Sequence, residues 1–275
     1  MSASVRRSGG IWIQGAGEIA SGIAVRLIRC RYRVILAEIS KPLAVRRKVA
    51  FSEAVFGGET AVEGISGRLF DTEEARFRSG LATVLVDPEG TALPRVGPAA
   101  VVDARLTKGP PAALPGCGSL LIGLGPGFRC GRDTDFIVET HRGGCLGAVI
   151  SEGEALPNTG IPGVLGGQSS RRVVRAPAAG QLVPCVAIGD LVVTGQVLGR
   201  IAGVEVVSRL GGMVRGLVHP SAELSVGEKV GDVDPRGSAV DPNRISDKSL
   251  AIAGGVLEIL LGNGILPTGG SEICR

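Results

Sequence analysis

Aromatic residues are scarce in this sequence: Phe, Tyr and Trp make up only 3% of its 275 residues. Proteins that bind single-stranded nucleic acid stack the bases on aromatic side chains, so this scarcity argues against such a function. The formal net charge of +4 suits a phosphate-bearing ligand, but it is equally compatible with an ordinary surface. We therefore expect no nucleic-acid partner.

Paired cysteines are also missing. The six cysteines include no C-x-x-C pair, and their spacings fit no zinc pattern, so we expect no metal site. Cys30 and Cys185 lie in apolar stretches that predict buried thiols. Cys130 follows a glycine-rich run and is a candidate reactive thiol, because only an accessible, deprotonated thiol is a good nucleophile.

No apolar run is long enough to predict a membrane span. The longest, residues 250–266, is interrupted by Glu258 and several glycines. The first apolar run soon meets Glu18, which is not typical of a secretory signal. We therefore expect a cytoplasmic protein. The 44 glycines and 16 prolines are scattered through apolar segments, which indicates a folded protein with many turns.

The residues that follow the first apolar run, 11–13, have the spacing of a dinucleotide-binding turn. Gly15, Gly17 and Ala20 form the pattern G-x-G-x-x-A, and apolar residues at helical intervals come next. In such a turn the first glycine permits the bend, the second admits a pyrophosphate, and the small third residue lets helix and strand pack. A turn that merely packs needs small residues too, so both interpretations stay open.

A second strand, predicted over residues 34–38, ends in Glu38, 23 residues after Gly15 (38 − 15 = 23). An acidic residue at this place binds the hydroxyls of a ribose and disfavours a 2′-phosphate. The segment after it, 41–54, predicts a helix with an apolar face. Its basic cluster, 46–48, suits either phosphate binding or a solvated helix face.

Four more apolar runs predict buried strands at 82–87, 99–104, 119–125 and 135–140. We expect an α/β fold, a Rossmann-like doubly wound parallel sheet, with ligands at the carboxyl ends of its strands. Those ends would bring polar and glycine residues to one crevice. The candidates for catalysis are Asp103, Lys108, Glu139, His141, Arg142 and Cys130, and a second backbone cradle is expected at Gly123, Gly125 and Gly127.

An internal repeat marks a second module. Gly180, Gly195 and Gly199 recur 32 residues later as Gly212, Gly227 and Gly231 (212 − 180 = 32), and each copy alternates β-rich stretches with glycine turns. The pattern resembles the half-motifs of biotinyl and lipoyl carrier domains, whose modified lysine lies on the hairpin between the halves. Residues 202–209 contain no lysine, so we expect a small β-sandwich without a swinging arm.

The last periodic segment, 245–261, predicts an amphipathic helix with Ser246 or Asp247 as N-cap. The expected organisation is therefore a Rossmann-like nucleotide-binding domain over 1–169, completed by 243–275. The β-sandwich module at 170–242 interrupts it.

Several unusual blocks resemble, in order, the selenium-dependent molybdenum hydroxylase system proteins of the YqeB type. The blocks are IQGAGEIASGIAVRLIR, AEISKPLAVRRKVAFSEAVFGGE, VVDARLTK, IGLGPGFRCGRDTDFIVETHRGGCLGAVI, PNTGIPG, KVGDVDPR and ISDKSLAIAGGVLE. The resemblance runs from about residue 11 to residue 261. Some relatives carry this region joined to a domain similar to the xanthine dehydrogenase maturation factor.

The resemblance implies an accessory protein that matures a selenium-dependent molybdenum hydroxylase of the xanthine or purine dehydrogenase type. Its ligand would be molybdopterin or the cytidine dinucleotide form of molybdopterin, held by Gly15, Gly17, Ala20, Glu38 and the second glycine run. Selenium transfer through Cys130 is a further hypothesis. The alternative is an NAD-dependent oxidoreductase that uses the same cradle, and a scaffold without ligand is a third possibility.

Overall fold

The structure is a computed structural model that describes residues 10–107, 111–116, 118–160 and 163–268. The chain forms two compact units: the first takes residues 1–40, 51–158 and 245–275, and the second takes 41–50 and 159–244. Each unit is described below by itself.

A nine-stranded sheet forms the centre of the first unit, in the order β3-β4-β5-β2-β1-β6-β7-β8-β9. Neighbours are parallel except for the pairs β3/β4 and β8/β9. All six strands expected from the apolar runs are present, whereas β3, β4 and β9 were not predicted. The strands are β1 (Gly10–Gln14), β2 (Arg33–Glu38), β3 (Glu59–Val62), β4 (Ile65–Phe70), β5 (Leu81–Val86), β6 (Ala100–Asp103), β7 (Leu120–Leu124), β8 (Phe136–Val138) and β9 (Val149–Ile150).

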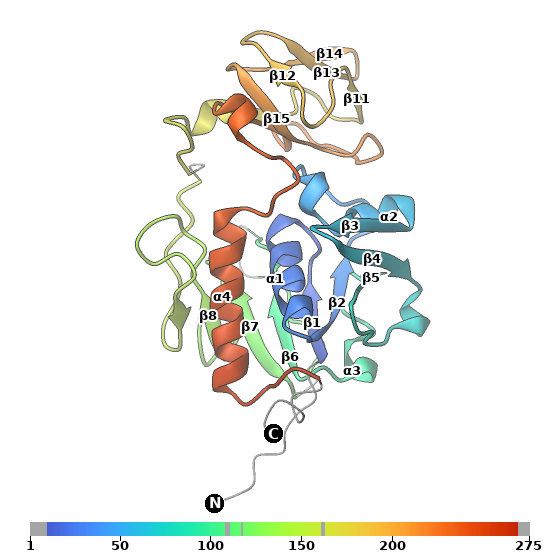
Figure 1. The fold of residues 1–275 in the computed structure, drawn as a ribbon, viewed down its shortest axis with the longest axis vertical. Coiled ribbons are helices and arrows are strands. Elements are labelled where there is room, and N and C mark those ends of the chain that lie inside the picture. Colours follow the sequence, from blue (N-terminus) through green and yellow to red (C-terminus); the bar gives the residue numbers. More distant parts are fainter. Residues whose placement is uncertain (1–9, 108–110, 117, 161–162, 269–275) are drawn as a thin grey trace, which may run out of the picture. The chain divides into compact units, whose positions relative to one another are not determined.

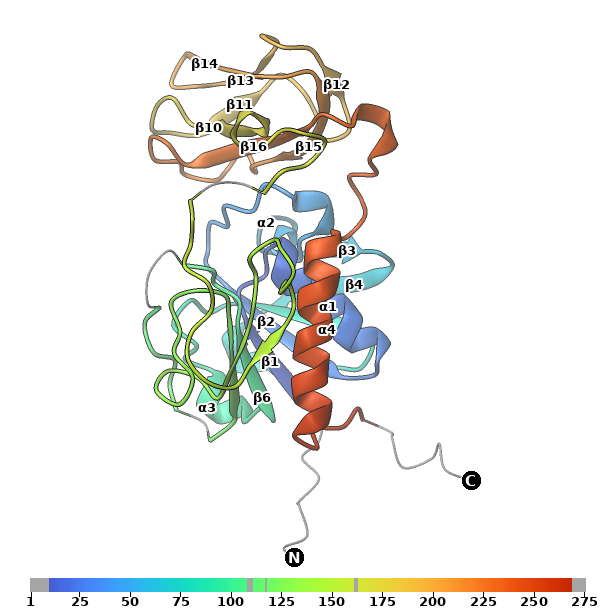
Figure 2. The same ribbon diagram turned by 90° about the vertical axis from the view of Figure 1, so that its left-hand side faces the viewer.

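Two long helices, α1 (Glu18–Arg29) and α4 (Asp247–Gly262), lie side by side on one face of this sheet (Figure 1). They run in the same direction, because Gly22 meets Ser249 near their N-termini and Tyr32 donates to the Ile265 oxygen (2.8 Å) beyond their C-termini. As predicted, Ser246 caps α4: its Oγ accepts the Ser249 N–H at 3.2 Å. The view in Figure 2 shows the same pair in profile.

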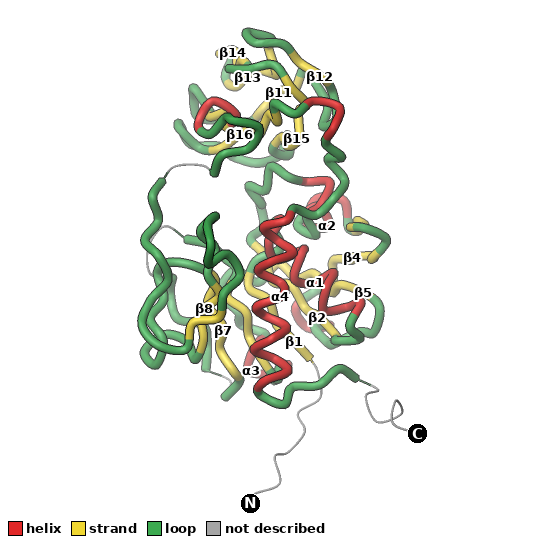
Figure 3. Tube along the Cα trace, turned by 60° about the vertical axis from the view of Figure 1, so that its left-hand side comes forward, coloured by secondary structure: helices red, strands yellow, loops and turns green. Residues whose placement is uncertain are grey.

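The opposite face of the sheet is covered differently. Trp12, Ile35, Leu85 and Val101 are buried there against Leu93 of the short helix α3 (Leu93–Val96) and against loop residues. The expected doubly wound arrangement, with helices on both faces, is therefore only partly present. In the described residues between β6 and β7, and between β7 and β8, there are loops and no helix (Figure 3). Prolines and glycines crowd the first of these connections, and both residue types disfavour a helix.

The helix predicted over 41–54 is wrong. Residues 41–50 contain only the 3-10 turn η1 (Arg47–Val49), and α2 (Glu53–Gly57) starts after it. Tertiary pairing explains the difference: the Leu217 N–H donates to the Val45 oxygen at 2.8 Å, and the buried Val45 side chain packs into the core of the second unit. The remaining 3-10 turns are η2 (Thr72–Glu74), η3 (Ser170–Arg172) and η4 (Gly237–Ala239).

Two antiparallel sheets make up the second unit, one in the order β10-β16-β15-β12 and the other in the order β11-β13-β14. An apolar core that includes Leu182, Leu198, Val214 and Val230 lies within the unit. The strands are β10 (Val173–Arg175), β11 (Leu182–Pro184), β12 (Leu191–Val192), β13 (Val197–Ile201), β14 (Val204–Val207), β15 (Gly212–Leu217) and β16 (Lys229–Asp234).

The two sequence repeats make matching contacts with exchanged partners. Gly180 of the first copy forms a bridge with Leu224 of the second, and Gly212 of the second copy pairs with Val192 of the first. Each glycine is 32 residues from the other, and so are their partners (212 − 180 = 32 and 224 − 192 = 32). The joint between the copies begins with a tight turn at Ala202 and Gly203, both with positive φ, and continues into β14.

A buried charge network ties the strands β15 and β16 of this unit to the 3-10 turn η3. Both carboxylate oxygens of Asp232 are used: Arg172 Nη1 donates to Oδ1 at 2.6 Å and Arg215 Nε donates to Oδ2 at 3.1 Å. Burial raises the pKa of Asp232, but the charges of Lys229, Arg215 and Arg172 outweigh this effect and hold the pKa below its usual value. The network is thus a satisfied, charged part of the interior.

Candidate functional site

The turn between β1 and α1 has the shape that the glycine spacing predicts. Gly15 has φ +109°, and its N–H donates to the Ala37 oxygen at 2.6 Å. A Cβ atom at Gly15 would come within 3.1 Å of the Ala104 oxygen, so a side chain is excluded there on two grounds. Ala20 is buried one turn into α1.

Gly17 is the residue of the turn that leaves space. It is the N-cap of α1, with φ −70° and ψ −174°, and it supplies no side chain to the free N–H groups of the first helical turn. Apart from its two chain neighbours, no atom of the described residues lies within 4 Å of the position that a Cβ would take. The end of α1 that attracts negative charge is therefore next to open space.

Glu38 holds this turn in place. Its Oε2 accepts the Ala16 N–H and its Oε1 accepts the Ile39 N–H, both at 2.8 Å. Burial raises the pKa of Glu38 above the usual 4.5, against the lowering effect of these two bonds. A carboxylate has about four acceptor positions, so Glu38 can accept hydroxyl groups in addition to the two N–H groups.

Further hydrogen bonds join the same turn to α1 and to residues 51–52. The Ala16 oxygen accepts both Ser21 Oγ and the Ser52 N–H at 3.0 Å, and Ser21 Oγ accepts the Phe51 N–H at 2.8 Å. Ser21 and Ser52 are fully buried. The turn is thus preorganised, which lowers the entropy that a ligand would lose on binding.

The second glycine run is largely filled by side chains. A Cβ at Gly123 would lie 2.6 Å from Phe128 Cγ, and a Cβ at Gly125 would collide with Thr140 Oγ1. Gly125 also has a φ of +71°, which favours glycine, and its N–H donates to the Val138 oxygen at 2.9 Å. These glycines therefore admit neighbouring side chains, where the sequence predicted an open cradle for a ligand.

A cavity of about 190 Å³ lies against β6 and β7 and contains two of the predicted residues, Asp103 and Gly127. Asp103 is buried and accepts Arg105 Nε at 3.0 Å, and Arg105 Nη2 also donates to the Ala112 oxygen at 2.6 Å. Arg105 thus joins the strand end to the loop beyond it. The candidate Lys108 lies outside the described residues.

Glu139, predicted as catalytic, is committed to the backbone. It is 2% exposed; its Oε1 accepts the N–H groups of Thr140 and His141 at 2.7 Å, and its Oε2 accepts the Leu156 N–H at 2.8 Å. These charge-assisted bonds join two loops, so the geometry favours an anchoring role. The side chain of His141 is exposed.

Arg142 makes a bidentate ion pair with Asp247 at the start of α4, with both N–O distances at 2.7 Å. The next residue, Lys248, was not predicted as a site residue. The pKa of Lys248 is lowered, mainly by burial and also by the charge of Arg142, although Glu18 and Glu139 act in the opposite direction. Lys248 thus lies within electrostatic range of the α1 N-terminus and of the β8 end. These segments are far apart in the sequence, so no local pattern could have predicted that they meet here.

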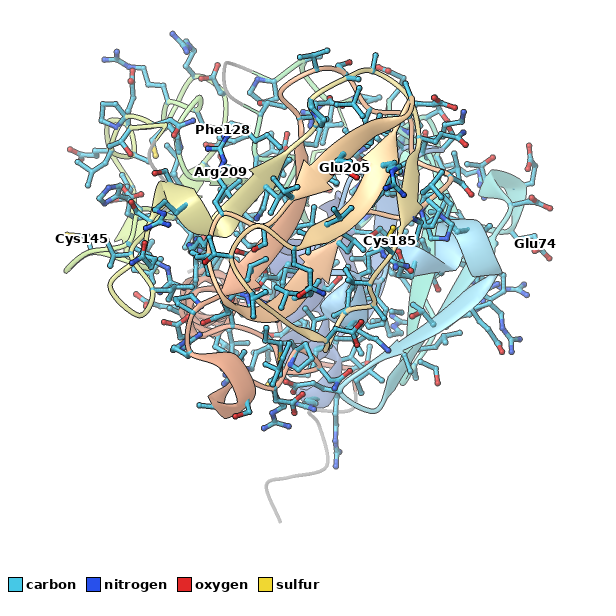
Figure 4. All side chains as sticks on the ribbon, turned by 90° about the horizontal axis from the view of Figure 1, so that it is seen from above. Glu74, Phe128, Cys145, Cys185, Glu205 and Arg209 are labelled. Carbon is cyan, nitrogen blue, oxygen red and sulfur yellow. The ribbon has the colours of Figure 1, made fainter. Side chains whose placement is uncertain are left out.

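The cysteines differ from expectation. Cys130 donates to the Ile150 oxygen at 3.3 Å, and burial raises the pKa of its thiol. A raised pKa keeps the thiol protonated, so this environment does not favour the nucleophile that selenium transfer would need. Cys185 was predicted to be buried but is exposed, as is Cys145 (Figure 4).

The predicted residues thus form three groups. The first glycine turn and Glu38 are together, Asp103 and Gly127 line the cavity, and Glu139, His141 and Arg142 lie at the β8 end near α4. Within the described ranges, no cluster of three or more His, Cys, Asp or Glu side chains could hold a metal ion. Among the described helices, none combines the length and apolar character of a membrane span.

Comparisons with known proteins give one strong similarity. No family model matches the chain. It is 44% identical over 252 residues to the uncharacterized protein YqeB of Escherichia coli (strain K12), an alignment that covers 90% of this chain and 47% of YqeB. The chain therefore spans about half the length of the curated relative that it matches.

Two solved structures show only partial likeness. A succinylglutamate desuccinylase/aspartoacylase from Rhodobacter sphaeroides is 27% identical over 24% of this chain and 22% of that chain, with a TM-score of 0.23. The ectoine utilization protein EutE (DoeB) from Ruegeria pomeroyi is 20% identical over 30% and 27% of the two chains, with a TM-score of 0.22. Likenesses of this extent carry no conclusion about ligand or activity.

Proposed function

We propose that the chain binds a nucleotide at the turn between β1 and α1, with phosphate groups at Gly17 and a ribose at Glu38. The open space beside Gly17 carries this proposal, because a phosphate needs close approach to backbone N–H groups at a helix N-terminus. Two ligands fit these residues: the cytidine dinucleotide form of molybdopterin, and NAD. Both carry a pyrophosphate and a ribose diol.

The order of the parallel strands supports the proposal. Numbered along the chain, the six predicted strands are arranged 3-2-1-4-5-6 (β5-β2-β1-β6-β7-β8), the order of Rossmann sheets. In such sheets ligands bind where the strand order reverses, and Gly15 lies there, after β1 and next to Ala104 beyond β6. The β module of the second unit, with its paired repeats, would then serve as a docking module similar in shape to biotinyl and lipoyl domains.

A glycine substitution tests the binding site. Gly17→Ala places a methyl group where nothing stands, so stability should fall by at most about 1 kcal/mol. Affinity for the bound nucleotide should fall at least about tenfold, because the methyl group occupies the space of a phosphate. Gly254→Ala is the matched control, since a Cβ there also meets nothing within 4 Å and lies in α4. Calorimetric titration with NAD and CDP measures both variants; the proposal fails if neither probe binds the wild-type chain.

The wider role that we propose is maturation of a selenium-dependent molybdenum hydroxylase, such as a xanthine or purine dehydrogenase. The sequence blocks that extend over most of the chain support it, together with a site that suits a dinucleotide tail. The hydroxylase should be purified from a host that lacks this protein and from the complemented host. Loss of selenium with molybdenum retained would assign the protein to a selenium step, and loss of both would assign it to cofactor insertion. Full loading and full activity would refute maturation.

An NAD-dependent oxidoreductase is the second candidate, favoured by the acid at Glu38. The geometry of Glu139 argues against this candidate, because the carboxylate is 2% exposed and both of its oxygens accept backbone N–H groups, which leaves it poorly accessible to a substrate. Tight NAD binding with a full hydroxylase in the deleted host would favour this candidate. Absence of any nucleotide binding would leave a scaffold role.

A further inference from the structure

Lys248 lies at the edge of the sheet where parallel α/β folds bind their ligands. It is the second residue of α4, which runs in the same direction as α1 and therefore starts, like α1, at the carboxyl ends of the strands (Figure 1). Ile252 and Gly255 share one side of α4 with Lys248, because they follow it by four and seven residues. Ile252 is fully buried, and a Cβ at Gly255 would lie 2.9 Å from Val138 Cγ1 of β8. Lys248 thus projects from the sheet-facing side of α4 at the ligand edge.

The ammonium group of Lys248 has no counter-ion close by. The residue is half-buried, and no described residue forms a side-chain hydrogen bond or ion pair with it. Its Nζ is not among the fully enclosed atoms of the described residues that lack a partner, so it stays in contact with solvent. A partly buried charge without a partner costs free energy, and an anion that reaches Nζ would offset this cost.

The charged groups around Lys248 are engaged elsewhere. They are Arg142, Asp247, Glu18 and Glu139. Asp247 pairs with Arg142 through two bonds of 2.7 Å, and Glu139 accepts three backbone N–H groups. Glu18 lies in the first turn of α1, where the helix dipole stabilises a carboxylate. Burial and, to a smaller extent, Arg142 lower the pKa of Lys248, so the surrounding carboxylates do not compensate its charge fully.

Building on the proposed nucleotide site, we propose that Lys248 Nζ donates to a phosphate oxygen of the ligand that the β1–α1 turn holds. A Cβ at Gly22 would touch the side chain of Ser249, the residue after Lys248, and Gly17 precedes Gly22 by five residues, about 7.5 Å along the helix axis. Helical side chains tilt toward the N-terminus, and lysine has a flexible four-carbon stem, so Nζ can extend toward the level of Gly17. Lys248 would supply the cation that the turn lacks, since Gly17 contributes no side chain.

Calorimetric titration of the full chain tests the role of Lys248. Inorganic pyrophosphate is the first probe, because it carries the phosphates without a base or a ribose, and NAD and CDP follow. Lys248→Gln should weaken the binding of these probes at least about tenfold, because a charge-assisted hydrogen bond is lost. Lys41→Gln is the matched control and should leave the affinity unchanged: Lys41 is exposed, belongs to the second unit and pairs with Glu223 at 3.1 Å.

A second readout follows the charge of Lys248 itself. Reductive methylation with ¹³C-formaldehyde labels the five lysines of the chain for NMR and keeps their charge, and Lys248→Arg identifies the Lys248 signal by removing it. Pyrophosphate should raise the pKa of Lys248 by at least about 1, because a bound anion favours the ammonium form. A lysine with a purely structural role would not respond. This measurement decides the question if Lys248→Gln does not fold.

Unchanged binding by Lys248→Gln, or an unchanged pKa of Lys248 at saturating pyrophosphate, would overturn the proposal. Equal losses in Lys248→Gln and Lys41→Gln would overturn it too, because they would reflect only the lower net charge. If pyrophosphate raises the pKa but neither NAD nor CDP binds, the nucleotide site is refuted and Lys248 remains an anion site. If NAD or CDP binds Lys248→Gln as tightly as the wild type, only the role of Lys248 is refuted. Absence of binding by all three probes would refute both.

Discussion

Substitution of Glu139 by glutamine separates an anchoring role from a catalytic one. The glutamine oxygen can still accept the Thr140 and His141 N–H groups, but as a neutral acceptor. Its NH₂ group would take the place of Oε2 and face the Leu156 N–H, so the third bond is lost and two buried donors point at each other without an acceptor. A hydrogen bond to a charged group contributes about 1.5–3 kcal/mol and a neutral one about 0.5–1.5 kcal/mol. We therefore expect the free energy of unfolding to fall by about 3–4 kcal/mol.

The assay for Glu139→Gln is urea unfolding followed by tryptophan fluorescence. Trp12 is the only tryptophan of the chain, is fully buried in β1, and belongs to the same unit as Glu139. In a thermal scan the same change corresponds to roughly 10 °C, at about 2–4 °C per kcal/mol for a domain of this size.

Glu154→Gln serves as the control for Glu139→Gln. Glu154 is exposed and pairs with Arg129 at 3.4 Å, an interaction that is expected to contribute at most about 1 kcal/mol. Equal stability of the two variants would refute the anchoring argument. If Glu139→Gln then also failed to support maturation, a direct role in the chemistry would be the better explanation.

Three more predictions test the packing and the electrostatics. Gly255→Ala should destabilise the first unit by about 1–3 kcal/mol, because its Cβ would collide with the Gly147 backbone oxygen. The neighbouring Gly254→Ala, whose Cβ would meet nothing within 4 Å, should instead stabilise α4 by about 0.5–1 kcal/mol in the same urea assay. Because the pKa of Glu38 is raised in the folded protein, the stability that is linked to its protonation is fully present below about pH 4.5 and is lost as the pH rises through the folded-state pKa. In urea titrations, the free energy of unfolding of the wild type should therefore fall relative to that of Glu38→Gln as the pH rises. A difference between the two proteins that is independent of pH would contradict this prediction. Asp232→Asn should lower the free energy of unfolding by about 3–5 kcal/mol, because Arg172 and Arg215 stay buried without the carboxylate. The stability that Asp232 contributes should be present above pH 3.8 and should be lost as the pH falls through its lowered pKa. Hydrogen exchange of the β15 and β16 amides measures both effects.

The sequence predicts the parts of the fold that depend on local patterns. Six strands, α1 and α4 lie where the apolar runs and helical intervals indicate, because each buries one continuous stretch. The hairpin of β3 and β4 was missed: its strands alternate only weakly, and its turn is Glu63-Gly64, with φ +45° and +83°. The false helix over 41–54 has another cause, since pairing of Val45 with Leu217 overrides the local periodicity.

Side-chain partners far apart in sequence could not be predicted. Glu139 appears as a polar residue at a strand end, but the Leu156 N–H that it binds is 17 residues away. Lys248 is similar: its neighbours Glu18 and Glu139 come from distant segments of the chain.

The glycines show why motif spacing alone does not define a ligand site. Gly17 and Gly125 both occur in glycine-rich turns after buried strands, yet a Cβ at Gly17 meets nothing and a Cβ at Gly125 would collide with Thr140. A glycine that makes room for a neighbouring side chain has already used its space in the folded protein. One that borders open space at a helix N-terminus leaves the backbone accessible from outside the chain. The first turn therefore supports the nucleotide proposal, whereas Gly123 and Gly125 have no room for the second half of a dinucleotide.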